Sequence, residues 1–237
     1  MTYQRDLNMN ERVLDALRQS RYRVMTDDRD LEDIYRLRYD CYRAEGSIAA
    51  NAQGIMHDAY DDTANCLHIA VETNGKLLAA VRLHLMSELS AVSPTAEVFP
   101  EITSGFGQGK TVLDPTRFVI DPSARKQRVS LHFLVLRIPF MAALFYDVDL
   151  ALAPVRSEHM AFYRRYLGYA PTLDPRSYPG LAKPIHLLTT NVREQRAAVL
   201  SRTPVFGPIA DMPQSDIAFP DLAGVYIPSQ DRRTAAA

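Results

Sequence analysis

The chain has 237 residues, of which 47% are apolar and 23% charged, as in a folded globular protein; a disordered or fibrous chain is excluded. Its 27 basic and 28 acidic residues leave a net charge of -1, which gives no indication of nucleic-acid binding. There is no run of the roughly 20 apolar residues that a membrane span requires and no signal-peptide pattern at the N-terminus, so we expect a cytoplasmic protein. One feature of the composition is unusual: 12 Tyr and 9 Phe are present, but no Trp.

The first part of the chain predicts two helices and a short strand. Residues 9–20 have the spacing of a short amphipathic helix, and residues 22–26 read as a brief strand. Asp27 or Asp28 then caps a helix that extends to about Glu45. The loop of about twenty residues that follows is long for a compact domain, and such loops are usually functional or mobile.

The middle of the chain predicts a hairpin and a further strand. Residues 67–73 and 76–86 are apolar segments separated by Asn74-Gly75, the strongest short-range hairpin signal, because both residues accept a positive φ. A third strand is expected at 111–120.

The last part of the chain continues the alternation of helices and strands. After a basic turn, residues 129–146 predict a long helix that Pro139 kinks or restarts. Beyond it we expect two strands and two helices, namely strands 148–154 and 185–190 and helices 158–167 and 191–202. The final 35 residues contain five prolines and are interpreted as a wrapping or partly disordered tail.

This order of elements predicts an α/β (α+β) fold with a single mixed sheet flanked by helices. We divide the chain into an N-terminal helical arm (1–21), one domain (22–190) and a C-terminal helix with a Pro-rich tail (191–237). The two cysteines and six histidines show no spacing typical of metal ligands, so we expect no metal.

Charged residues occur where a folded chain would bury them. Arg82 lies in the middle of an apolar strand and needs a partner or a solvent cleft, because an unpaired buried charge is very costly. The candidates for a common cluster with Arg82 are Arg38, Asp58, Asp61, Asp114 and Arg117. The residues alone leave open whether this cluster is a structural ion-pair network or a substrate site.

A second candidate site is the helix that directly follows the buried strand 148–154. Tyr163 in this helix is either a packing group or a proton donor, since a phenol can serve as a general acid. Glu158 and His159 open the same helix and are reserve acid/base candidates.

Charge is uneven along the chain despite the neutral total. Residues 27–62 contain ten acids and four arginines, whereas residues 123–137 contain four basic residues and no acid. The basic run is either a solvated helix face or a local positive patch that holds a phosphate or an acidic partner.

Several of these segments resemble known acyltransferases. The helix Phe-Tyr163-Arg-Arg-Tyr-Leu-Gly168-Tyr is similar to a helix of the GNAT N-acyltransferase superfamily. The order of the charged residues resembles the acyl-homoserine-lactone autoinducer synthases and, more fully, the FeeM-type N-acyl amino acid synthases. The latter resemblance covers roughly residues 22–190 through the segments Leu37–Gly46, Asp58–Asn65, Val81–His84, Asp114–Phe118, Glu158–Tyr163 and Tyr178–Leu181.

The chain differs from two related families in features that those families usually share. Autoinducer synthases carry a Trp after the first helix and a Glu where Asp114 stands, and this chain has neither. CoA-dependent GNAT enzymes usually have a Gly-rich turn that holds the pyrophosphate, whereas residues 121–128 contain no Gly. Arg125, Lys126 and Arg128 in this turn fit the single phosphate and the acidic surface of acyl carrier protein.

The resemblance implies a GNAT-like N-acyltransferase that moves a fatty acyl chain from an acyl carrier protein thioester to the amine of an amino acid. It implies no bound cofactor, with acyl-ACP or acyl-CoA as co-substrate. Asp114, directly or through a water, would accept the proton of the amine, and Tyr163 would protonate the departing thiol. A backbone N–H on a splayed central strand would stabilise the oxyanion.

The remaining residues receive substrate-binding roles by the same resemblance. Arg38, Arg82 and Arg117 would order the loop that carries Asp58 and Asp61, or bind the carboxylate of the acceptor. Phe118 and the other aromatic residues near it form either an acyl tunnel or an ordinary core. A CoA-dependent acetyltransferase and a non-catalytic module that binds acyl carrier protein remain the alternatives.

Overall fold

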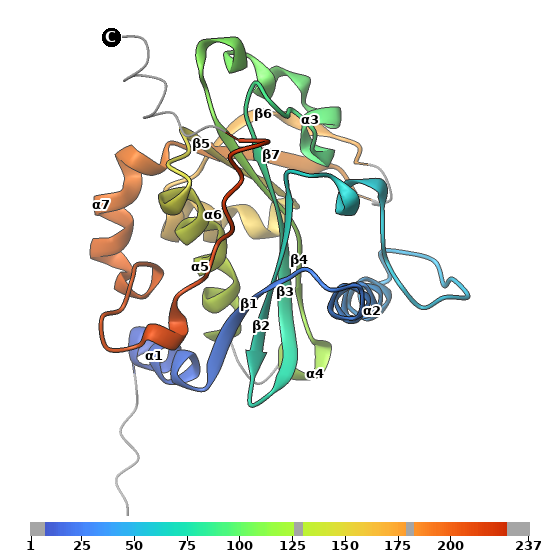
Figure 1. Ribbon diagram of the computed structural model, residues 1–237, viewed down its shortest axis with the longest axis vertical. Helices are drawn as coiled ribbons and strands as arrows, with labels where there is room; N and C mark the ends of the chain where they lie inside the picture. The colour runs from blue at the N-terminus through green and yellow to red at the C-terminus, as the bar shows by residue number, and fades with distance from the viewer. Residues whose placement is uncertain (1–7, 126–129, 179–182, 227–237) are drawn as a thin grey trace, which may run out of the picture.

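The computed structural model describes residues 8–125, 130–178 and 183–226, and within them seven strands form one mixed sheet in the order β1-β2-β3-β4-β5-β7-β6. Neighbouring strands are antiparallel except β4 and β5, which are parallel. The strands are β1 (Ser20–Met25), β2 (Cys66–Thr73), β3 (Lys76–Met86), β4 (Val112–Ile120), β5 (Leu150–Val155), β6 (Ala170–Arg176) and β7 (Ile185–Thr190). The predicted single mixed sheet flanked by helices is confirmed (Figure 1).

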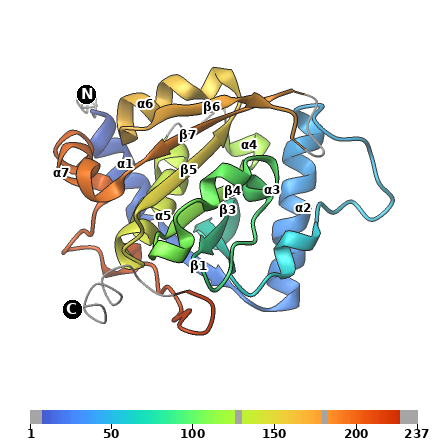
Figure 2. The same cartoon turned by 90° about the horizontal axis from the view of Figure 1, so that it is seen from above.

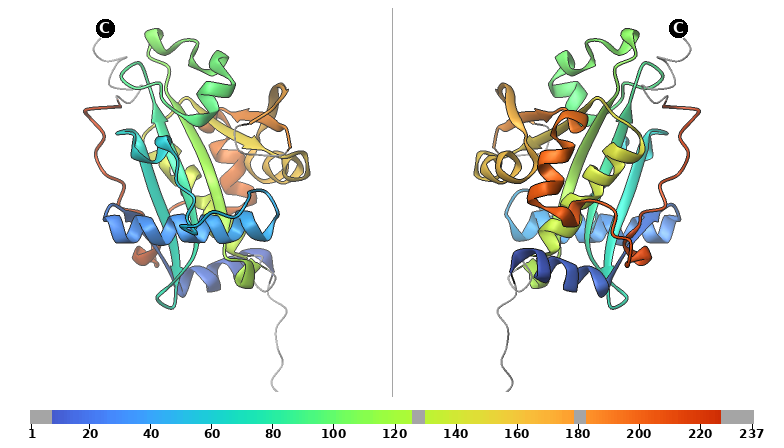
Figure 3. Two further views of the ribbon diagram at one scale, coloured as in Figure 1. Left: turned by 90° about the vertical axis from the view of Figure 1, so that its right-hand side faces the viewer. Right: turned by 90° about the vertical axis from the view of Figure 1, so that its left-hand side faces the viewer.

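Helices cover both faces of the sheet. The α-helices are α1 (Met9–Arg18), α2 (Asp28–Ala44), α3 (Pro94–Val98), α4 (Pro122–Arg125), α5 (Ser130–Phe145), α6 (Met160–Leu167) and α7 (Val192–Arg202). The short 3-10 helices are η1 (Ala59–Asp62), η2 (Pro100–Thr103), η3 (Phe106–Gln108), η4 (Ser157–His159), η5 (Pro204–Phe206) and η6 (Pro213–Ser215). The two views in Figure 3 show α2 in front of one face and α7 in front of the other. No helix in the described ranges is both long enough and apolar enough to cross a membrane.

The main core lies between the sheet and α5. This helix is apolar on nearly all sides, with eleven of its residues buried, because the sheet covers one side and other segments cover the rest. It runs through Pro139 without ending there. The view from above in Figure 2 shows α5 and α2 on opposite faces of the sheet, and α2 covers a smaller core that contains Ile34 and Ala80.

The hairpin predicted at Asn74-Gly75 is confirmed. Asn74 (φ 51°) and Gly75 (φ 74°) both adopt the left-handed conformation, which is the conformation that a tight hairpin turn requires. The register then shifts once, between Val71 and Glu72, so that His68 faces Arg82. This shift decides which polar side chains share a face of the sheet.

The edge strand β6 was not among the predicted strands. It carries Pro171 and Pro175, and its pairing with β7 is interrupted by two register shifts. Proline lacks the N–H that a strand donates and is confined to edges or irregular positions, so this strand has no clear sequence pattern.

The C-terminal segment wraps around the core as far as Tyr226. Six of its hydrophobic side chains are buried: Val205, Phe206, Met212, Ile217, Phe219 and Tyr226. Arg137 in α5, which is 1% exposed, donates to the carbonyl oxygens of Val205 (2.9 Å), Gly207 (2.9 Å) and Ser215 (2.5 Å). The wrapping interpretation therefore holds for residues 203–226; residues 227–237 lie outside the described part.

Candidate active site

The two parallel strands at the centre of the sheet separate after a short contact. β4 and β5 pair only at Val112–Leu150 and Leu113–Ala151, and β5 is then paired along its length with β7. A bulge in β4 lies beyond this contact, because Ala80 faces Val119 while Arg82 faces Thr116, which leaves one extra residue in β4. Arg117 within the bulge has φ 54°, a left-handed conformation that is uncommon for residues other than glycine.

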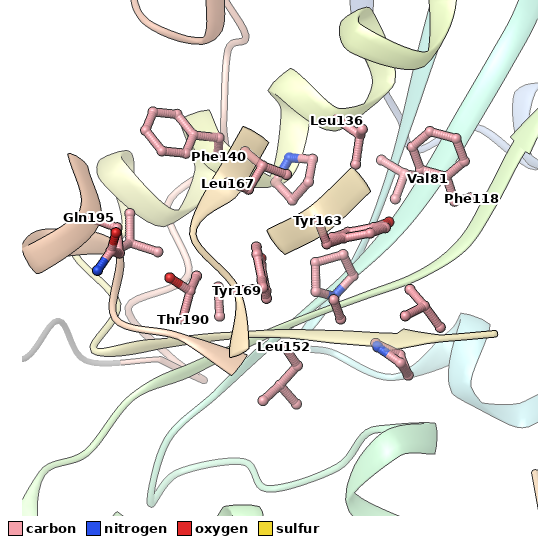
Figure 4. A pocket seen from close by; sticks show the side chains of 17 residues that line it. Val81, Phe118, Leu136, Phe140, Leu152, Tyr163, Leu167, Tyr169, Thr190 and Gln195 are labelled. Carbon is pink, nitrogen blue, oxygen red and sulfur yellow. The ribbon is translucent and has the colours of Figure 1, made fainter. Parts of the chain in front are cut away.

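A pocket opens where these strands diverge, on the α5 face of the sheet (Figure 4). Pro115 and Phe118 of β4 line one wall, and residues 151–155 of β5 line another. Helices α5, α6 and α7 complete it with Leu136, Pro139, Phe140, Tyr163, Leu167, Val192 and Gln195. The lining is mostly apolar, which suits an aliphatic ligand.

Tyr163 is the polar side chain of this pocket that the sequence singled out. It projects from α6, which begins only after a separate turn of 3-10 helix over Ser157–His159, so the predicted helix 158–167 is correct in its second part. Its ring meets Tyr169 edge to face with 5.5 Å between centroids, and its hydroxyl makes no hydrogen bond within the described residues. Burial raises the pKa of Tyr163, so the phenol is protonated at neutral pH.

The opposite face of the sheet carries a buried network of arginines and aspartates. Arg38 in α2 and Arg82 in β3 both donate to the Asp61 Oδ1, at 2.7 Å and 2.8 Å, and all three side chains are 0% exposed. Arg82 and Arg117 hold the two oxygens of Asp58, each at 2.6 Å. Five of the six residues predicted as one cluster therefore come together, from elements far apart in sequence, whereas Asp114 does not join their ion pairs.

Local backbone structure places the two aspartates. Asp58 precedes η1 and accepts a hydrogen bond from the Tyr60 N–H, while the Asp61 side chain accepts from the Asp58 N–H, a reciprocal arrangement that is typical of a capping box. Burial by itself would raise the pKa of Asp58, but the hydrogen bonds and charges of Arg82 and Arg117 lower it to about 2. Burial also opposes ionisation of Asp61, and the charges of Arg38 and Arg82 lower its pKa nevertheless.

Two histidines belong to the same network, and the sequence analysis did not identify them. Arg38 donates to the His68 Nδ1 at 3.0 Å, so this nitrogen is unprotonated and the Nε2–H donates to the Asp61 carbonyl at 3.1 Å. His84 donates from Nε2 to the Tyr60 carbonyl at 3.0 Å. Burial, with the charge of Arg38 or Arg82, lowers the pKa of His68 to about 4 and of His84 to about 3.

The network therefore holds more positive than negative charge. Three guanidinium groups face two carboxylates with lowered pKa values, and both histidines are neutral near pH 7. Within the described part of the chain, the buried Arg82 Nη2 and Arg38 Nε find no acceptor. A further anion with oxygen acceptors would balance the charge and supply the missing partners.

Asp114 lies on this polar face, beside the network but separate from it. It is 0% exposed, and its two oxygens accept from the Thr95 hydroxyl at 2.8 Å and the Thr95 N–H at 3.3 Å. Across the sheet its backbone partner is His84. Burial raises the pKa of Asp114, so its carboxylate binds a proton more strongly than an exposed one.

The remaining predicted residues lie away from these groups. Glu158 and His159 are on the exposed turn η4, where Arg156 pairs with Glu158 at 3.2 Å and with the His159 Nε2 at 3.3 Å. Arg125 ends α4, just after β4, which is the place expected for the basic turn. Lys126 and Arg128 lie outside the described residues. No three His, Cys, Asp or Glu side chains converge as metal ligands in the described ranges.

Comparison with known proteins places these features in a class. A splayed pair of central parallel strands, with a pocket at the divergence and helices on both faces, defines a GNAT-like acyltransferase fold. FeeM, an N-acyl amino acid synthase from uncultured soil microbes, superimposes with a TM-score of 0.64 at 15% identity, over 77% of this chain and 96% of that one. BjaI, a CoA-dependent acyl-homoserine lactone synthase solved with SAM and isopentyl-CoA, superimposes with a TM-score of 0.59 at 15% identity over 91% and 99%. MesI, another CoA-dependent acyl-homoserine lactone synthase, superimposes with a TM-score of 0.58 at 19% identity, over 84% of this chain and 100% of that one.

The sequence itself identifies the family. The family described as N-acyl amino acid synthase FeeM matches residues 33–191, which is more than half of the chain. The protein belongs to the FeeM N-acyl amino acid synthase family and is an acyltransferase. No curated protein matches the sequence significantly.

Proposed function

We propose that this enzyme transfers a fatty acyl chain from an acyl carrier protein thioester to the amine of an amino acid, giving an N-acyl amino acid. The observation that carries the proposal is the bulge in β4. Its two adjacent residues serve opposite faces of the sheet, because Phe118 lines the apolar pocket while Arg117 pairs with Asp58 in the charged network. An acyl chain in the pocket and a charged acceptor at the network would meet beside the bulge.

The acceptor is proposed to bind through its carboxylate. The excess positive charge and the unpartnered guanidinium N–H groups of Arg38 and Arg82 favour an anionic group with two oxygens. Asp58 is the exposed member of the network, at 27%, so a carboxylate reaches Arg117 and Arg82 by displacing or joining it.

The proton transfers are assigned to Asp114 and Tyr163. The amine loses a proton, attacks the thioester carbonyl and forms the C–N bond as the C–S bond breaks. Asp114, whose raised pKa strengthens it as a base, receives that proton through Thr95 or a water, because its own oxygens are covered. Tyr163, protonated and facing the pocket, donates to the leaving thiolate, and a free N–H on the splayed strands stabilises the oxyanion.

Acyl carrier protein is the proposed donor because residues 121–128 lack the glycines that a pyrophosphate cradle uses. Arg125, Lys126 and Arg128 would then bind the phosphate of the pantetheine arm or the acidic carrier surface. BjaI and MesI are CoA-dependent, so acyl-CoA is the donor to compare.

The test is an acyl-transfer assay with purified enzyme, a long-chain acyl carrier protein or the matching acyl-CoA, and each of the twenty amino acids. Release of free thiol together with an N-acyl amino acid in the mass spectrum supports the proposal, with the carrier-bound donor preferred. Asp114→Asn is expected to lower kcat at least 100-fold, whereas Asp216→Asn, at an exposed carboxylate in the C-terminal segment, is expected to leave it unchanged. Absence of thiol release with every acceptor and both donors would falsify the proposal.

A further inference from the structure

The pocket differs between its two ends. Val81 and Phe118 lie at the end next to the β4 bulge, and Gln195 and Thr190 lie at the other, with Tyr163 and Tyr169 between them (Figure 4). The lining between the ends is aliphatic or aromatic. Apart from the two tyrosine hydroxyls, the polar side-chain groups of the lining are the Gln195 amide and the Thr190 hydroxyl at the far end.

The Gln195 side chain packs closely against its neighbours at this far end of the pocket. It lies in the first turns of α7, and its side chain rests against the backbone of Gly168, the residue that ends α6 with φ 69°. A Cβ atom on Gly168 would come within 2.6 Å of the Gln195 Oε1, so the contact depends on the glycine. The Thr190 hydroxyl donates to the Gly168 carbonyl at 3.3 Å, which joins the ends of α6 and β7 at the same point.

The Gln195 amide makes no hydrogen bond within the described residues. It is only partly buried, so its donor and acceptor groups remain open to solvent. A methyl terminus that reached the amide would displace that water without replacing its hydrogen bonds, which is unfavourable.

We propose that Gln195 sets the upper limit on the length of the acyl chain. The inference rests on the proposed function, in which the thioester lies beside the bulge and the acyl chain extends along the pocket. Each methylene buried on the way improves kcat/KM, by about fourfold. The gain stops where the chain end meets the hydrated amide.

This residue lies outside the segment that defines the family. The family match ends at residue 191, and α7 begins at Val192. Gln195 therefore lies outside the residues that the family match covers.

The experiment measures kcat/KM for a ladder of saturated acyl carrier proteins of increasing length, with the acceptor held constant. Gln195→Met keeps a side chain of similar length without the amide, and we expect its optimum to move to chains at least two carbons longer. Gln195→Glu puts a charge at the same point, and we expect at least a tenfold loss with the longest chain that the wild type accepts. Arg196→Gln, at the exposed next residue of α7, is the control and should keep the wild-type profile.

The outcomes separate the two proposals. A wild-type enzyme that acylates no amino acid with any chain contradicts the proposed function. A wild-type enzyme that is active, with a length profile that both Gln195 variants reproduce, overturns the role of Gln195 alone. Equal unfolding midpoints in urea show that the variants are folded.

Discussion

Asp61 is the residue on which the buried charges depend. It is the common acceptor of Arg38 and Arg82, and no other carboxylate contacts Arg38 in the described part of the chain. Asp61 and both arginines are fully buried, so water cannot take the place of the Asp61 carboxylate without a large loss of free energy. The acidic residue next to it, Asp62, is 69% exposed and pairs only with His57 there.

Asp61→Ala should therefore lower the free energy of unfolding by about 3–5 kcal/mol, because two buried guanidinium groups lose their carboxylate. Asp62→Ala is the matched control and should change it by less than about 0.5 kcal/mol. Urea unfolding at pH 7 measures both. Equal effects of the two substitutions would contradict the network as described.

The substitution Tyr163→Phe removes only the hydroxyl group, so it distinguishes a catalytic role of this residue from a packing role. The hydroxyl has no hydrogen-bond partner within the described residues, so its removal should change the free energy of unfolding by less than about 0.5 kcal/mol. If Tyr163 is the proposed acid, kcat for acyl transfer should fall about 100-fold. Tyr166→Phe, one turn along α6, serves as the control, and an unchanged kcat for Tyr163→Phe would remove Tyr163 from the mechanism.

At the scale of elements, the bulge in β4 connects the pocket with the charged network. Pro115 faces the pocket and Thr116 faces the network, where it accepts a hydrogen bond from Arg82. Simple alternation would then turn Arg117 to the pocket and Phe118 to the network, and the extra residue reverses the two side chains. The bulge is maintained although Arg117 adopts φ 54°, a conformation that costs a non-glycine residue free energy. The pair with Asp58 and the cation–π contact with Tyr42, at 5.6 Å, offset this cost.

The backbone strain can be measured with two variants that both lack the guanidinium group. Arg117→Gly should be more stable than Arg117→Ala by about 1 kcal/mol, because glycine accepts a positive φ. Chemical denaturation of the two proteins gives the difference directly. A more stable alanine variant would show that residue 117 leaves the left-handed region once the ion pair is lost.

The same elements explain how far the sequence could predict the site. Apart from β6, the order of the strands followed from local patterns, as did the Asn74-Gly75 turn. Arg82 indicated ion pairs because a charge in an apolar strand needs partners. His68 did not stand out, because the turn alone would place Leu67 opposite Arg82. The register shift at Val71/Glu72 brings His68 there instead. Bulges are tertiary features without a local signal, and the positions of Thr95 over Asp114 and of Gln195 in the pocket likewise depend on chain crossings.

At the scale of the whole molecule, the C-terminal segment supports the pocket from outside. Phe206 stacks on Phe133 and packs against Phe140, which lines the pocket, with centroids 6.0 Å apart in both cases. Arg137 fixes the same segment through three carbonyl oxygens and lies over the Tyr22 ring at 5.5 Å.

Arg137→Leu should lower the free energy of unfolding by about 3 kcal/mol or more, because three buried carbonyl groups lose their donor. Limited proteolysis should then cut within residues 203–226 faster than in the wild type. Arg196→Leu, at an exposed arginine of α7, is the control for both measurements. Wild-type stability and protease resistance in Arg137→Leu would mean that the segment is held by its apolar contacts alone.

The free energy of unfolding should also decrease at mildly acidic pH. The pKa values of about 4 for His68 and 3 for His84 lie below the ordinary value of 6.5, so below pH 6.5 the unfolded chain binds protons that the folded protein does not. Each histidine then lowers the free energy of unfolding by up to about 1.4 kcal/mol per pH unit. Asp58, with a pKa of about 2 against 3.8, adds a loss only below about pH 4.

Urea unfolding between pH 7.5 and pH 5 measures this slope of the free energy of unfolding against pH. His68→Gln and His84→Gln should each flatten it, whatever they do to stability at pH 7.5. A wild-type free energy of unfolding that is constant over this range would contradict the lowered pKa values, because both histidines would then take up protons at the same pH in the folded protein as in the unfolded chain.

The hydrogen bonds from Arg137 to the C-terminal segment limit how early the core can form during protein synthesis. Its three acceptors lie 68, 70 and 78 residues further along the chain. A growing chain that already contains all the strands, as far as Thr190, still has an arginine in its main core with none of these oxygens available. The enzyme can therefore complete its core only after residues as far as Ser215 have been synthesised, and a nascent chain or one terminated before them would expose α5 and the pocket beside it to chaperones and proteases.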